Sequence, residues 1–291
     1  MSKRDERLGA LYVSLSAVLF GTMPLVAKIA YRHGGNACTA VFGRYAFGAL
    51  IAAGIIALRP GLSFRVARRQ MGQLLRLSIL NALTPLLLYL SYNTVDSGLA
   101  TTLHFTYPII VILLMRLCFG ERLTGRKLLC TGLCAAGVLL LYTPGGRSSL
   151  MGMALALASG LTFAIFVIGL GRSDLRTVPA LVTTFWLALF AAAEVAVFAL
   201  CTGDLALSQG WQAWAAELEL GLMTTALAMA LFQKGVFLCG EVNASLLSNL
   251  EPITGIAIGV MVFGEVVTLK VAAGVLCILT AAVMTALAKR A

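Results

Sequence analysis

Long apolar runs separated by short polar breaks fill the chain from one end to the other. Each run is close to the roughly 20 residues that an α-helix needs to cross the hydrocarbon core of a bilayer. The breaks carry loop-forming residues, as in Gly34-Gly35-Asn36 and Pro144-Gly145-Gly146. The pattern predicts an all-α membrane protein with ten transmembrane helices. The predicted spans are residues 8–30, 38–58, 73–92, 97–118, 127–143, 150–171, 179–201, 213–236, 241–263 and 266–288.

Composition excludes a soluble globular protein, because the 291 residues are 60% hydrophobic and only 12% charged, and one soluble core cannot bury so much apolar surface. The first run is too long for the core of a signal peptide and has no small-residue cleavage site, so we interpret it as the first span. The net charge of +10 comes without a basic stripe interleaved with aromatic residues. No nucleic-acid partner is therefore predicted.

The distribution of Lys and Arg predicts the orientation, because basic residues of short loops tend to stay on the cytoplasmic side. With a cytoplasmic N-terminus, sixteen of the 22 Lys and Arg residues fall in inner loops or adjoining helix ends. Only Arg32, Arg147 and Lys270 fall on the outer side, and the other three, Lys28, Arg44 and Arg116, lie within predicted spans. We therefore expect a multi-pass protein of the cell (inner) membrane with both termini in the cytoplasm.

The sequence also repeats itself. Pro108-Ile109 recurs as Pro252-Ile253, and Phe119-Gly120-Glu121 recurs in the same register as Phe263-Gly264-Glu265. A repeat of five helices is odd, so the second copy must run through the membrane upside down. The sequence predicts two inverted five-helix repeats, residues 1–145 and 146–291, an architecture typical of secondary transporters. The alternative is an old duplication that is kept only for folding.

Several short motifs resemble the drug/metabolite transporter superfamily in its ten-helix, EamA-like form. They are Phe20-Gly21-Thr22 with Lys28, Arg44, Tyr107-Pro108, Gly120-Glu121, Glu251-Pro252 and Gly264-Glu265. The resemblance implies a substrate cavity lined by helices 1 to 4 and 6 to 9, with helices 5 and 10 at the periphery. The sequence departs from the family at Phe20, where many members carry Trp.

Glu251 lies in the middle of the ninth predicted span. An isolated ionised carboxylate there is costly, so it must be paired, protonated or hydrated. One interpretation is a group that binds a proton for coupling or the ammonium of a substrate. The alternative is a structural carboxyl that stays neutral and bonds to a neighbouring helix.

Pro108 and Pro252 have no N–H for the carbonyl four residues earlier, so both helices should kink and release a carbonyl within the membrane. We expect the freed carbonyls to join a polar belt that binds substrate. The belt consists of His104, Tyr107, Ser248, Asn249 and Glu251. The alternative is a kink needed for packing or for a rocking motion.

His104 is the only histidine within a predicted span, and an imidazole titrates close enough to neutral pH to carry a coupling proton. The alternative, and the more frequent role of a lone histidine, is a hydrogen-bonded core residue. Arg44 is predicted as a cation that attracts a carboxylate or phosphate, whereas Lys28 should snorkel to the interface. If Arg44 and Glu251 both face the cavity, their opposite charges suit a zwitterion such as an amino acid.

Tyr89 and Gln233 occupy equivalent positions in the two repeats, and we predict both as substrate contacts, together with Thr22. Polar side chains in membrane helices also hold helices together without touching substrate, which is the alternative.

The leading hypothesis is a secondary active exporter or exchanger of small metabolites such as amino acids, working by alternating access with proton or counter-substrate coupling. Alternatives are a facilitative or import carrier and, less favoured, an intramembrane lipid-handling protein. The motifs H-E-x-x-H and G-x-S-x-G are absent, so we predict no enzyme and no catalytic residue. The seven cysteines form no C-x-x-C pair, so no metal or cofactor is predicted.

The expected partners are a small-molecule substrate and the lipid bilayer. The small-residue pattern Gly132-x-x-x-Ala136 would also allow two copies to pack as a homodimer.

Overall fold

The structure is a computed structural model that describes residues 3–95, 97–121, 124–141, 149–263 and 268–287. Every regular element in these ranges is helical. The elements are α1 (Lys3–Phe20), α2 (Met23–Arg32), α3 (Ala37–Leu58), α4 (Arg68–Ser91), α5 (Ser97–His104), α6 (Tyr107–Phe119), α7 (Gly125–Leu141), α8 (Leu150–Gly171), η1 (Asp174–Thr177), α9 (Ala180–Thr202), α10 (Trp211–Leu220), η2 (Gly221–Ala228), α11 (Met229–Cys239), α12 (Glu241–Leu247), α13 (Leu250–Phe263) and α14 (Leu269–Ala286).

Each predicted span corresponds to one helix or to a row of helix pieces, so the all-α membrane fold is confirmed. Four spans are made of pieces, namely α1–α2, α5–α6, α10–η2–α11 and α12–α13. Eight of the units in the described ranges are long and apolar enough to cross a membrane. The predicted repeat boundary at residue 145 and the motif Gly264-Glu265 lie outside the described residues.

Proline explains three of the four interrupted spans. Pro24, Pro108 and Pro252 stand within the first turn of α2, α6 and α13, where their missing N–H is harmless, whereas continuing the preceding helix through them would cost a hydrogen bond and a steric clash. The eighth span is interrupted by the π-helical segment η2. Pro85 is different, because α4 continues through it.

α4 begins at Arg68, five residues before the predicted start of that span. The Gln70 side-chain oxygen accepts the backbone N–H of Ala67 at 2.9 Å. This bond satisfies one of the free donors at the helix start, which an apolar-run pattern cannot reveal.

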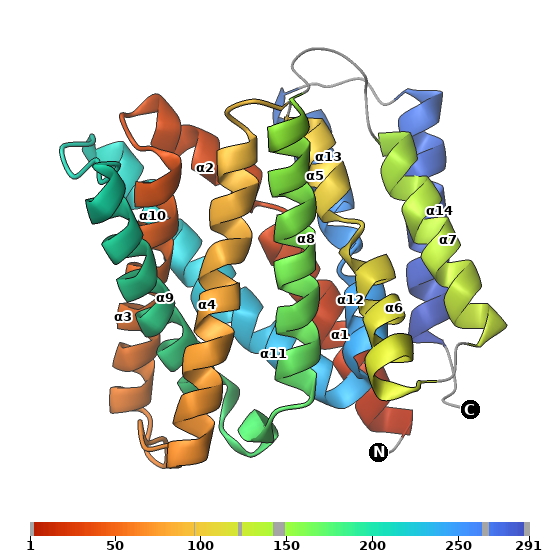
Figure 1. Cartoon of the computed structure of the whole chain (residues 1–291), viewed down its shortest axis with the longest axis horizontal. Coiled ribbons are helices and arrows are strands. Elements are labelled where there is room, and N and C mark those ends of the chain that lie inside the picture. The colour runs from red at the N-terminus through yellow and green to blue at the C-terminus, as the bar shows by residue number, and fades with distance from the viewer. Residues whose placement is uncertain (1–2, 96, 122–123, 142–148, 264–267, 288–291) are drawn as a thin grey trace.

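The chain ends show the inversion of the two halves. The start of α1 and the end of α14 lie on one face of the helix bundle, and α8, the first helix of the second half, begins on the opposite face (Figure 1). We call the face with the chain ends the terminal face and the opposite one the distal face. Two chain ends on the same side of a membrane require an even number of crossings, as the ten-span pattern predicts.

The two halves are interleaved rather than separate. The most extensive helix contacts pair α3 with α9, α7 with α14, α4 with α8 and α1 with α11, and each pair takes one helix from each half. The α7–α14 pair stands at one edge of the bundle (Figure 1). Large apolar side chains such as Leu58 and Leu117 remain exposed on the outer surface, where lipid covers them.

Candidate functional site

Arg44 is a buried cation on α3, with only 5% of its surface exposed. Its Nη2 donates to the Tyr45 hydroxyl at 3.0 Å, and its Nη1 lies 2.9 Å from the sulfur of Met23, just after the break between α1 and α2. Its Nε has no partner. The guanidinium is therefore held in place on one side and retains an unused donor.

The support behind Arg44 comes from Pro85. A proline cannot donate to the carbonyl four residues earlier, which here belongs to Asn81. That carbonyl accepts the Tyr45 hydroxyl at 2.6 Å. Pro85 thus leaves α4 continuous but frees an acceptor that orients Tyr45, and through Tyr45 it positions Arg44.

Glu251 stands in the first turn of α13, which packs against α1 near its broken end. A Cβ on Gly21 would come within 2.7 Å of the Glu251 carbonyl oxygen, so the two breaks touch. The carboxylate is partly exposed and makes no hydrogen bond or ion pair with any described residue. It is near enough to Arg44 for the charges to interact, although the two do not pair directly.

Tyrosines surround these two opposite charges. Tyr89, Tyr92 and Tyr107 all lie within electrostatic reach of Glu251. Tyr89 stacks on Tyr92 with ring centroids 5.7 Å apart and meets Tyr31 edge-on at 6.4 Å. We call Arg44, Tyr89, Tyr107 and Glu251 the polar centre.

His104 lies beside the polar centre in an aromatic setting. Its ring contacts Tyr107 at 5.7 Å and Phe163 at 5.8 Å. Its Nδ1 lies 2.9 Å from the Ser159 hydroxyl oxygen, whose single hydrogen goes to the Ala156 carbonyl at 2.7 Å. Nδ1 must therefore carry the proton that bonds to Ser159, and Nε2 is left as the acceptor.

The carbonyls that the span-breaking prolines release do not form an open ligand belt. The backbone carbonyl oxygen of Ser248 accepts the backbone N–H of Glu251 at 3.0 Å. The His104 oxygen faces Gly160 of α8, where a Cβ would come within 2.9 Å. One carbonyl is satisfied by a tight turn and the other is covered by a close helix crossing, so side chains rather than carbonyls face the polar centre.

The other predicted contacts differ in where they are engaged. The Gln233 amide donates to the Thr184 hydroxyl at 3.1 Å between α11 and α9, and Asn249 lies beside Cys134 of α7, so these two side chains join neighbouring helices. The hydroxyls of Ser248 and Thr22 donate to carbonyls of their own spans, Ala244 at 3.0 Å and Leu19 at 2.8 Å. Ser248 also lies beside the Tyr107 hydroxyl, at the edge of the polar centre.

Several residues at or near the site escaped the sequence reasoning. Phe163 is an aromatic residue whose ring contacts Tyr107 at 4.7 Å and Phe232 at 5.8 Å, measured between ring centroids. Phe163 and Phe20 stand at corresponding positions of the two repeats, so the repeat offered a signal for it. Three further acids stand within apolar spans, Glu194, Glu217 and Glu219. Intramembrane acids are rare enough to be noticed from sequence alone.

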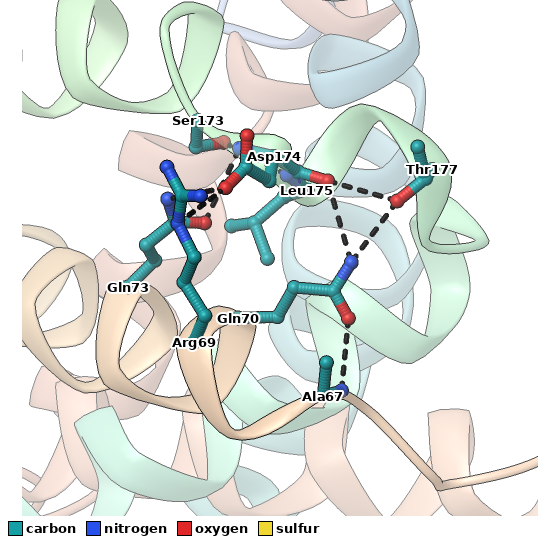
Figure 2. A network of polar contacts seen from close by, with 8 residues as sticks. All are labelled: Ala67, Arg69, Gln70, Gln73, Ser173, Asp174, Leu175 and Thr177. Carbon is teal, nitrogen blue, oxygen red and sulfur yellow. Dashed lines mark hydrogen bonds and ion pairs between the residues drawn. The ribbon is translucent and has the colours of Figure 1, made fainter.

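A polar seam joins the two halves on the terminal face. Arg69 of α4 forms an ion pair with Asp174 of η1 at 2.8 Å, and Gln70 donates to the Thr177 hydroxyl at 3.0 Å. Gln73 also bonds to Asp174, through its amide nitrogen at 3.3 Å and its amide oxygen at 3.2 Å. Figure 2 shows this network between the two segments. We call it the terminal-face seam.

A second seam joins residues 33–39 to residues 204–210 on the distal face. The Asn36 amide donates to the Asp204 carbonyl at 2.6 Å, and the Thr39 hydroxyl accepts the Ala206 N–H at 2.8 Å. The N–H of Gly210 donates to the His33 carbonyl at 2.9 Å. We call this the distal-face seam, so contacts between the halves lie on both sides of the polar centre.

The polar centre presents groups that can recognise a small polar molecule, namely a cation, an anion and tyrosine rings. Within the described residues no group of three or more His, Cys, Asp or Glu side chains converges to hold a metal ion. The arrangement therefore suits reversible binding of a small polar molecule.

Comparison with known proteins finds similar transporters and a similar fold. An uncharacterized transporter of Archaeoglobus fulgidus is 29% identical over 266 residues, covering 91% of this chain and 92% of that one. An uncharacterized transporter of Synechocystis is 27% identical over 189 residues, covering 62% and 56%. A protein of known crystal structure, 16% identical, shares the fold with a TM-score of 0.80 over 95% of both chains.

Both halves also match one family description, over residues 7–143 and 150–287. Together with the apolar helices, these matches make the chain a multi-pass membrane protein. The chain belongs to the EamA-like transporter family.

Proposed function

We propose that the protein is a secondary transporter that moves small zwitterionic metabolites, amino acids foremost, across the inner membrane by alternating access. The observation that carries the proposal is the pair of opposite charges, Arg44 from the first half and Glu251 from the second, close enough to interact but not paired. A carboxylate bound at Arg44 and an ammonium at Glu251 would complete both groups. The family and the names of its relatives support transport itself.

Alternating access requires that a ligand be gripped by both halves, so that its binding and the movement of the halves are coupled. Arg44 and Glu251 meet this requirement because they belong to different repeats. Burial strengthens the requirement, since two uncompensated charges in a membrane interior are costly. A zwitterion removes that cost only while it touches both sides.

Coupling to protons would use Glu251, whose carboxyl has no described hydrogen-bond partner and can bind either a proton or a substrate ammonium. The two would then compete for one group, which makes the protein an exporter or exchanger driven by a proton gradient. The terminal face would lie in the cytoplasm. His104, whose Nε2 is unprotonated, would be a second proton carrier beside the polar centre.

A charge-matched ligand series tests the substrate class. Three compounds with the same side chain differ in their charges. Phenylalanine carries both charges, phenylalaninamide carries only the ammonium, and N-acetylphenylalanine carries only the carboxylate. We expect only the zwitterion to raise the melting temperature of the purified protein, because binding to the folded state stabilises it. The same comparison with alanine separates charge recognition from side-chain recognition.

Three variants assign the charges. Arg44→Gln should lose the response to the zwitterion, and so should Glu251→Gln, whereas Lys28→Gln should keep it, because Lys28 is an exposed cation on a neighbouring helix. In liposomes, Glu251→Gln should also lose flux driven by a pH gradient. The substrate proposal is wrong if no zwitterion stabilises the protein, or if the Lys28 and Arg44 variants behave alike. Flux that ignores pH in the unmodified protein would indicate a facilitative carrier.

A further inference from the structure

Glu217 is an intramembrane acid that the polar centre does not use. It lies on α10, and its exposed fraction is 0%, whereas Glu194, Glu219 and Glu251 are each only partly buried. The carboxyl sits directly against Gly43 of α3, and a Cβ at that position would collide with Oε2. Glu217 therefore fills the space that the missing side chain of Gly43 leaves between the two halves.

The hydrogen bonding of this carboxyl is incomplete. Oε1 accepts the Gln209 amide N–H at 2.8 Å, but Oε2 has no partner. Two neighbouring buried groups, the Gln209 amide oxygen and the Tyr31 hydroxyl, are also without partners. A structural carboxyl would normally be satisfied on both oxygens, so this one has an unfilled position.

No cation balances Glu217. None of the ion pairs among the described residues includes it. The elements packed on α10 are α2, α3 and η2. Lys28 and Arg32 of α2 are exposed to the outside of the bundle, whereas Glu217 is fully buried. Arg44 of α3 bonds to Met23 and Tyr45, and η2 has no titratable residue.

Among the described residues, Tyr31 of α2 interacts with Glu217 from a neighbouring helix and can supply no positive charge. His33 of the distal-face seam is exposed, and its Nδ1 lies 2.9 Å from the Ile29 carbonyl oxygen of its own helix. On α10 itself, Glu219 is two residues further on, which places it on the opposite side of the helix.

We propose that Glu217 is a proton-binding site that keeps the distal-face seam closed. A buried carboxylate without a cation is far less stable than a buried neutral carboxyl. Glu217 therefore holds a proton while α10 is packed on Gly43. When α10 separates from α3, water reaches the carboxyl and the proton leaves. The proposal rests on the proposed function only in that this seam opens during transport.

Linkage makes the coupling reciprocal. If opening releases a proton, then a rise in pH favours opening and a fall in pH favours closure. A neutral glutamine at position 217 mimics the protonated state, so it should keep the seam closed at every pH. This result separates a proton site from a merely structural hydrogen bond, which glutamine would keep without changing any pH response.

The first experiment is infrared spectroscopy of the whole purified protein. The carbonyl stretch of protonated carboxyl groups should lose the contribution of one buried group in Glu217→Gln and keep it in Glu219→Gln. Unchanged intensity in Glu217→Gln would overturn the proposal. Gly43→Ala retains Glu217 but forces its carboxyl out, so it should also lose this carboxyl contribution to the carbonyl stretch at neutral pH. It therefore provides a second test if Glu217→Gln folds poorly.

The second experiment uses native cysteines to report on the seam. Cys38 is buried at the start of α3, and Cys201 is exposed near the end of α9. The readout is the ratio of Cys38 to Cys201 labelling by a membrane-impermeant maleimide, and Glu217→Gln, in which both thiols are unchanged, controls for the effect of pH on thiol reactivity itself. The ratio should rise with pH in the unmodified protein and in Glu219→Gln, and stay low in Glu217→Gln.

A Glu217→Gln ratio that rises like that of the unmodified protein would overturn the proposal. Repeating the titration in sodium and in potassium tests whether Glu217 binds a metal cation instead of a proton. A labelling ratio that follows the sodium concentration rather than pH would assign the site to sodium and overturn the proposal. Neither experiment needs a substrate. If both experiments give the expected results while no zwitterion stabilises the protein, the proposed substrate class is wrong and the proton site at Glu217 is supported.

Discussion

The two seams that join the halves are built from different kinds of contact, although the repeat relates the halves by inversion. On the distal face, backbone groups, capping side chains and a glycine contact hold the helices together, and Glu217 is sealed between them. On the terminal face, long exposed side chains reach across, and the Arg69 and Asp174 side chains are 81% and 47% exposed.

The difference predicts which seam opens at lower cost. Water can replace an exposed ion pair with little loss of free energy. Separating helices that are packed down to the backbone costs more, because water does not replace the close van der Waals contacts that are lost. The terminal face is therefore the readily opened side, and the distal face needs a trigger, for which Glu217 is the candidate.

The strongest test of the distal-face seam is Gly43→Ala. The added methyl collides with the Glu217 carboxyl, and overpacking of this kind costs about 1–3 kcal/mol. We expect a clearly lower melting temperature. Gly54→Ala is the matched control, since it lies in the same helix with nothing within 4 Å of its Cβ position and should be neutral or stabilising. Equal effects of the two substitutions would refute the tight packing of this seam.

Asn36→Ala removes two distal-face contacts at once. The Asn36 side chain caps α3 through the Thr39 N–H at 2.8 Å and also crosses to Asp204. Loss of a cap and a hydrogen bond costs about 1–2 kcal/mol, and cysteine labelling at the seam should increase. Ser173→Ala on the terminal face removes a cap that bonds only within its own half, at 3.3 Å to the Leu175 N–H, so it should leave the labelling unchanged.

Pro85→Ala should affect the polar centre and leave both seams unchanged. The restored N–H should bond to the Asn81 carbonyl and take this acceptor from Tyr45, so Arg44 loses its support. We expect an unchanged or higher melting temperature, because alanine is the better helix former. Zwitterion affinity should fall about fivefold, the effect of about 1 kcal/mol from one hydrogen bond. Weaker binding with lower stability would instead indicate general misfolding.

Arg69→Gln should have the smallest effect on stability. Exposed ion pairs contribute less than about 1 kcal/mol, and salt screens them. The melting temperature should fall slightly in low salt and match that of the unmodified protein in high salt. Arg65→Gln is the control, because its exposed side chain has no ion-pair partner among the described residues, and it should change nothing. A large, salt-independent loss would show that the terminal-face seam is as tightly held as the distal one.

Much of the fold could be predicted from the sequence, because the bilayer imposes a simple rule on the chain. Apolar runs of the right length become spans, and the recurrence of Pro108-Ile109 as Pro252-Ile253 predicts the inverted repeat. Prolines in three spans also indicate where those helices break. The π-helical interruption of the eighth span has no such signal, because it depends on packing against neighbouring helices.

The candidate site was less predictable. Intramembrane charges single out Arg44 and Glu251, since charge is costly in lipid whatever surrounds it. Gln233 and Asn249 look equally suitable in sequence, yet the structure engages them with Thr184 and Cys134. The sequence does not show whether a polar side chain faces a neighbouring helix or a ligand, because this depends on which helix packs beside it.

The sequence by itself therefore determined the membrane setting, the ten spans, the inverted halves and the charged groups that lipid will not tolerate unpaired. Only the tertiary structure decided that Pro85 frees a carbonyl for Tyr45, that Gly43 receives the Glu217 carboxyl, and that one seam adjoins a buried carboxyl while the other is held by exposed side chains. The physical reason is the range of the interactions. Hydrophobic length and charge cost act on each segment alone, whereas hydrogen bonding and close packing depend on which segments meet.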